Sequence, residues 1–165
     1  KNAQNTSLSA PKYAQDISVM GMITRIGGLK EFNSLLVLVP AALLHLLPFL
    51  RISQYKHLAF RMTYLCLLLI SVVIFSSSAE SPTFVIAVTG VGIWYVIQTD
   101  LKNSFKNALL IFVILLTSLS ATDLFPPYVR QHFIAPYSLK ALPCFVVWCV
   151  LMWQLLTKNF KSASA

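Results

Sequence analysis

Five apolar runs, separated by short polar links, constrain the fold of this chain more than any other feature. They cover about residues 34–50, 61–77, 83–98, 108–121 and 139–156. A helix that crosses a membrane needs about 17–25 mainly apolar residues, and it satisfies its own backbone hydrogen bonds in lipid. The runs therefore predict an all-α fold, a polytopic integral membrane bundle of about five transmembrane helices with additional interfacial helices.

The composition supports this interpretation. Of the 165 residues, 57% are hydrophobic and only 11% are charged, and the mean hydropathy is +0.73. A soluble domain carries about 25% charged residues. The net charge of +8 comes from basic residues that stand singly between the apolar runs. This pattern indicates contact with lipid headgroups, so we expect membrane lipid as a partner and no nucleic acid.

The first residues differ from the rest. Residues 1–14 are polar and are expected to form a loop, whereas residues 15–29 have apolar positions at helical spacing and end in Gly27-Gly28. The latter segment predicts a re-entrant or interfacial helix. The predicted organisation is thus the loop, a helical bundle over 15–157, and a tail over 158–165.

Several residues inside the runs have predicted structural roles. Proline in a membrane helix frees a carbonyl and bends the axis, so we expect His45 to bond a carbonyl freed by Pro40 or Pro48, with a proton relay as the alternative. Gly90 and Gly92 are predicted to allow close helix–helix contact. Trp94 and Tyr95 are predicted to lie at a membrane interface, and Pro143 is predicted to kink its helix.

The three cysteines all lie inside apolar runs, at Cys66, Cys144 and Cys149. Their spacing does not pair them on one helix face, so neither a disulfide framework nor a zinc site is expected. We interpret them as buried apolar residues. No metal and no cofactor is predicted for the chain.

The orientation follows from the links. The link Ser76–Thr83 contains Glu80 but neither Lys nor Arg. The side of the membrane on which this link lies carries four basic residues near the spans, namely Arg25, Lys30, Arg130 and Lys140. The opposite side carries seven, namely Arg51, Lys56, Arg61, Lys102, Lys106, Lys158 and Lys161. The positive-inside bias predicts a cytoplasmic C-terminus in a multi-pass protein of the inner (plasma) membrane.

With five crossings, most of the unusual polar residues fall on the extracytoplasmic face. They are Asp16, Ser18, Arg25, Glu80, Thr83, Asp123, Arg130, His132 and Lys140. Cations there can bind a phosphate and carboxylates can bind hydroxyls, which suits a lipid-linked substrate. Two structural alternatives stay open: these residues pair with one another, and Glu80 caps the helix that follows it.

Three stretches resemble the C-terminal part of glycosyltransferase family 87. They are Asp16–Arg25, the Glu80–Thr83 link, and Ser120–Asp123 together with Lys140–Pro143 and Trp148. That family consists of polytopic GT-C enzymes that transfer a hexose, often mannose, from a polyprenyl-phosphate donor outside the cytoplasmic membrane. Its members often have Asn-Gln-Ser before the Gly and Arg, which Ser18, Gly21 and Arg25 match.

The resemblance implies a chain that holds substrate without turning it over. In such enzymes the proposed catalytic carboxylate lies in the first extracytoplasmic loop, and no segment here corresponds to that loop. We therefore expect no catalytic residue in this chain, and an N-terminal part of the same protein as its partner. Arg25, Arg130 or Lys140 would stabilise the phosphate of a polyprenyl-phosphate-linked sugar as it leaves.

Two other classes of function remain. A transporter-like subunit predicts ionisable groups at mid-membrane depth, where only His45 comes close. A small non-catalytic membrane scaffold requires neither a polar cleft nor such groups.

Overall fold

The computed structural model describes residues 17–28, 33–76, 81–98, 101–119, 128 and 139–160. Within these ranges every regular element is helical and there is no strand, so the predicted all-α fold is confirmed. Among the same residues, none of the helices combines the length and the apolar character needed to cross a membrane.

The helices follow the apolar runs closely. The main ones are α1 (Val19–Gly27), α2 (Leu35–Leu46), α3 (Leu58–Ile74), α4 (Phe84–Ile97), α5 (Asn103–Val113) and α8 (Ala141–Thr157). Short 3₁₀ turns η2 (Leu47–Leu50), η3 (Ile52–Lys56) and η4 (Ser81–Thr83) connect them, and a π-helical turn η5 (Ile114–Ser118) extends α5.

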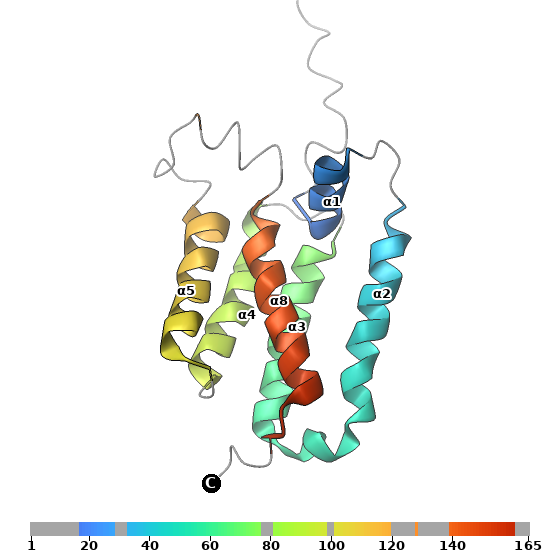
Figure 1. Cartoon of the computed structure of the whole chain (residues 1–165), viewed down its shortest axis with the longest axis vertical. Coiled ribbons are helices and arrows are strands. Elements are labelled where there is room, and N and C mark those ends of the chain that lie inside the picture. Colours follow the sequence, from blue (N-terminus) through green and yellow to red (C-terminus); the bar gives the residue numbers. More distant parts are fainter. Residues whose placement is uncertain are drawn as a thin grey trace, which may run out of the picture.

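The long helices stand side by side and alternate in direction (Figure 1). α3 packs against both α4 and α8, and α5 flanks α4. α2 stands at one edge of the bundle, and α1 lies near the end where α3 finishes and α8 begins. The core is formed by large buried side chains of α3, α4 and α8: Phe60, Leu67, Ile70, Ile74, Trp94, Val147, Leu151 and Leu155.

The contact between α3 and α4 depends on one of the two predicted glycines. A Cβ on Gly90 would lie 3.1 Å from Leu69 Cβ and 3.2 Å from the backbone oxygen of Cys66. A Cβ on Gly92 would meet no atom within 4 Å. Close helix approach is therefore confirmed at Gly90 and wrong for Gly92, which points away from α3.

Trp94 and Pro143 differ from their predicted roles. Trp94 is 0% exposed, and its indole Nε1 donates to Gln154 Oε1 at 3.2 Å, so the predicted interfacial position is wrong for this residue. Pro143 is the third residue of α8. The first helical N–H groups have no partner within the helix, so Pro143 costs α8 no hydrogen bond there and no kink is needed.

The cysteines are all thiols, as expected, but they are not all buried. Cys66 and Cys144 lie in the core, whereas Cys149 is exposed on α8. The prediction of a buried apolar role is therefore wrong for Cys149. A helix that is apolar on every side gives no stripe from which the buried face could be identified.

Candidate functional site

Five of the polar residues proposed for a substrate site lie outside the described residues. These are Asp16, Glu80, Asp123, Arg130 and His132. Four others are described, namely Ser18, Arg25, Thr83 and Lys140. Their elements meet toward one end of the bundle, because α1 lies beside the start of α8 and α4 begins at that same end (Figure 1).

Ser18 has a structural role. Its side chain is fully buried and caps α1, because the N–H of Gly21 donates to Ser18 Oγ at 3.2 Å. Gly28 closes the other end of α1 with a left-handed backbone, φ 63°, and its N–H donates to the oxygen of Thr24. The sequence prediction of a short helix ended by the glycine pair therefore holds, and the Ser18 hydroxyl is already used within it.

The side chains of Arg25 and Thr83 differ in their exposure to solvent. Arg25 is half-buried in the last turn of α1, where a cation interacts favourably with the helix dipole. Thr83 is exposed and immediately precedes α4.

Lys140 is the most unusual of the four. It is only 9% exposed, and it is the one charged side chain that is buried among the described residues. Burial lowers the pKa of its ammonium group from the ordinary value of 10.5. It also directly precedes α8, where the helix dipole disfavours a positive charge. Groups with shifted pKa values cluster at functional sites, which makes Lys140 a candidate site residue.

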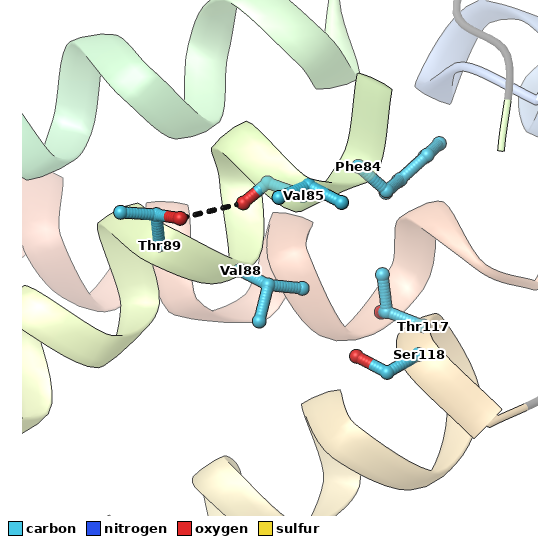
Figure 2. Close-up of a pocket in the computed structure, with 6 residues that line it drawn as sticks. All are labelled: Phe84, Val85, Val88, Thr89, Thr117 and Ser118. Carbon is cyan, nitrogen blue, oxygen red and sulfur yellow. Dashed lines mark hydrogen bonds between the residues drawn. The ribbon is translucent and has the colours of Figure 1, made fainter. Parts of the chain in front are cut away.

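A groove of about 290 Å³ opens between α4 and η5 (Figure 2). It is lined by Phe84, Val85, Val88, Thr89, Thr117 and Ser118. Val88 on α4 faces Ser118 on η5 across the groove. The Thr89 hydroxyl donates within its own helix, to the oxygen of Val85 at 2.8 Å.

Thr117 joins the groove to the lysine. Its buried hydroxyl lies 3.0 Å from the backbone oxygen of Lys140, to which it donates, and 3.7 Å from Cys144 Sγ. Thr117 belongs to the π-helical turn, and such turns occur frequently at functional sites. The wall of the groove is therefore hydrogen-bonded to the residue that carries the buried cation.

The groove was not predicted from the sequence. The sequence feature that marks it is a pair of hydroxyl residues, Thr117 and Ser118, near the end of the apolar run 108–121. No cluster of three His, Cys, Asp or Glu residues suited to a metal occurs within the described part of the chain.

Comparisons of the chain with protein-family models, with curated proteins and with solved structures give no match.

Proposed function

We propose that this chain is the substrate-holding C-terminal portion of a multi-pass membrane glycosyltransferase. It would move a hexose, such as mannose, from a polyprenyl-phosphate donor to an acceptor on the extracytoplasmic face of the plasma membrane. The observation that carries the proposal is the buried Lys140, whose backbone oxygen accepts a hydrogen bond from Thr117 in the wall of a mainly apolar groove. A cation and an apolar groove on neighbouring residues suit an amphiphile with a phosphate head and an isoprenoid tail.

The apolar side chains on the outer surface of the bundle support the proposal that lipid surrounds it. Large apolar side chains are exposed on α2, η2, α3, α4 and α5, among them Leu35, Leu36, Val39, Leu43, Leu46, Leu50, Val72, Val85, Val96 and Ile111. Large exposed apolar patches are rare on water-soluble monomers. α3 and α8 each have 17 residues, which gives a length of about 26 Å. A bilayer with a core of about 30 Å would thin locally around them, at a modest energetic cost.

In this proposal the groove receives the first isoprene units of the donor and Lys140 approaches its phosphate. Arg25, on α1, is a second phosphate ligand. Asp16, Glu80, Asp123 and Arg130 are assigned to the same site from the sequence alone. Negative charge grows on the phosphate as the sugar leaves, and nearby cations stabilise it. The catalytic carboxylate would come from an N-terminal part of the same protein.

Binding of a polyprenyl-phosphate mannose to the chain in lipid nanodiscs tests the proposal. Removing the charge with Lys140→Gln should weaken binding by about tenfold or more, the effect of losing one charge-assisted hydrogen bond. Filling the groove with Val88→Trp should also weaken it. Lys102→Gln is the matched control, because Lys102 is exposed and precedes α5, whereas the groove is formed by the η5 turn at the far end of α5.

Equal binding of the wild type and the Lys140→Gln and Val88→Trp variants would contradict the assignment of the site. Equal binding of the dephosphorylated polyprenol would contradict the role of the cation. No binding at all would favour the non-catalytic scaffold.

A further inference from the structure

His45, near the end of α2, lies in a polar network that joins α2 to the bundle. Its ring Nδ1 is 2.6 Å from the backbone oxygen of Ala41, and its Nε2 is 2.6 Å from Ser71 Oγ on α3. Ser71 Oγ also lies 2.5 Å from the oxygen of Leu67 and accepts a hydrogen bond from Trp148 Nε1 on α8 at 2.9 Å. One imidazole and one hydroxyl thus connect three helices.

The donors and acceptors in this network can be counted. A carbonyl oxygen only accepts, so Nδ1 of His45 must carry a hydrogen for its contact with Ala41. An indole N–H only donates, so Ser71 Oγ is the acceptor from Trp148. The Ser71 hydroxyl has one hydrogen, and two groups compete for it: the oxygen of Leu67 and a neutral Nε2 of His45.

Only one protonation state satisfies all four contacts. If His45 is neutral, the Ser71 hydrogen serves Nε2 or Leu67, and the other short contact then brings two lone pairs together. If His45 is protonated, Nε2–H donates to Ser71 Oγ and the Ser71 hydroxyl donates to Leu67. Ser71 Oγ then donates once and accepts twice, which is its full capacity.

The surroundings can accommodate the charge. The ring centroid of Trp148 lies 5.8 Å from that of His45, within the distance of about 6 Å at which an aromatic ring attracts a cation. Tyr64 on α3 donates its hydroxyl to the backbone oxygen of His45 at 3.2 Å.

Other titratable side chains on the packed helices are engaged elsewhere or exposed. On α3, Arg61 is exposed and Cys66 is buried, with its backbone against Gly90 on α4. On α8, Cys144 contacts Thr117 and Cys149 is exposed. His45 is the only titratable side chain of α2 itself.

We propose that His45 is a proton-binding site that fastens α2 to α3 and α8, and that loss of its proton loosens α2. The helix has few other ties, because Ala41 is its only buried residue and its remaining side chains are half-buried or exposed. Docking of α2 would therefore depend on whether the His45 ring carries hydrogen on both nitrogens.

Nitrogen NMR of the full chain in micelles tests the proposal, following the His45 ring and the Trp148 indole across about pH 5 to 8. We expect the Trp148 indole signal to change in step with the charge of His45. His45→Gln should abolish that pH response, and His57→Gln, at the start of α3, should preserve it. An unchanged Trp148 signal in the wild type, or identical profiles for the wild type and His45→Gln, would overturn the proposal.

Labelling of a buried cysteine gives a second measurement that needs no change at His45. In a Cys149→Ser background, Ala41→Cys places a thiol on the buried side of α2. In the same protein carrying His45→Gln, a rise in pH accelerates labelling through thiolate formation alone. With His45 present, loss of the His45 bond at high pH should raise the labelling rate by about a further tenfold. An equal rise in both proteins would contradict the proposal.

Discussion

Replacing Gly90 with alanine tests the packing of α3 against α4 directly. Alanine favours a helix over glycine by about 1 kcal/mol, so an unobstructed site would gain stability. At Gly90 the new methyl would lie 3.1 Å from Leu69 Cβ, 3.2 Å from the oxygen of Cys66 and 3.2 Å from Ile70 Cγ1. The first two atoms belong to the helix backbone or are directly attached to it, so neither can turn away. Overpacking of this kind costs about 1–3 kcal/mol.

Gly92→Ala is the matched control, because it lies in the same helix and its Cβ would meet nothing within 4 Å. We expect Gly92→Ala to stabilise the protein by about 0.5–1 kcal/mol and Gly90→Ala to destabilise it by about 0–2 kcal/mol. The free energy of unfolding in mixed micelles, measured by helical circular dichroism, gives both values. If the two variants change stability equally, the close approach of the helices is wrong.

Two further predictions concern the ends of α8. Arg51 Nη1 donates to the backbone oxygen of Leu155 at 2.7 Å, so Arg51→Gln should lower the free energy of unfolding by about 1.5–3 kcal/mol; the exposed Arg61→Gln is its control, and equal effects would contradict the contact. Burial lowers the pKa of Lys140, so the folded state disfavours its charged form, and this cost disappears as pH rises toward the ordinary value of 10.5. The stability of Lys140→Met relative to the wild type should therefore fall as the pH rises toward 10.5 in unfolding measurements; a relative stability that rises with pH would contradict the sign.

The sequence predicts the helices better than it predicts their faces. Apolar runs and a glycine pair locate the helices and the end of α1, because helices need long apolar stretches and glycine adopts positive φ at little cost. The buried face of α4 could not be predicted. This helix is apolar all round, so its pattern does not distinguish the buried Trp94 from the exposed Val96.

His45 illustrates a second limit. A hydrogen bond from its side chain to a backbone carbonyl was expected, and the structure has one. The acceptor, however, is Ala41, whose oxygen is not released by either proline: Pro40 removes the partner of Leu36 and Pro48 that of Leu44. The decisive partners Ser71 and Trp148 lie on other helices, 26 and 103 residues away along the chain. Such partners depend on how helices pack, which local sequence does not determine.

Polar contacts therefore set the position of α8. Because α8 is apolar on most sides, its hydrophobicity pattern alone does not select one rotation against α3. Specific hydrogen bonds do distinguish them, because a buried donor or acceptor left without its partner is costly. Thr117 holds the oxygen of Lys140 at the start of the helix, and Arg51 holds that of Leu155 near its end. With both ends held, α8 cannot slide or turn without breaking one of these bonds.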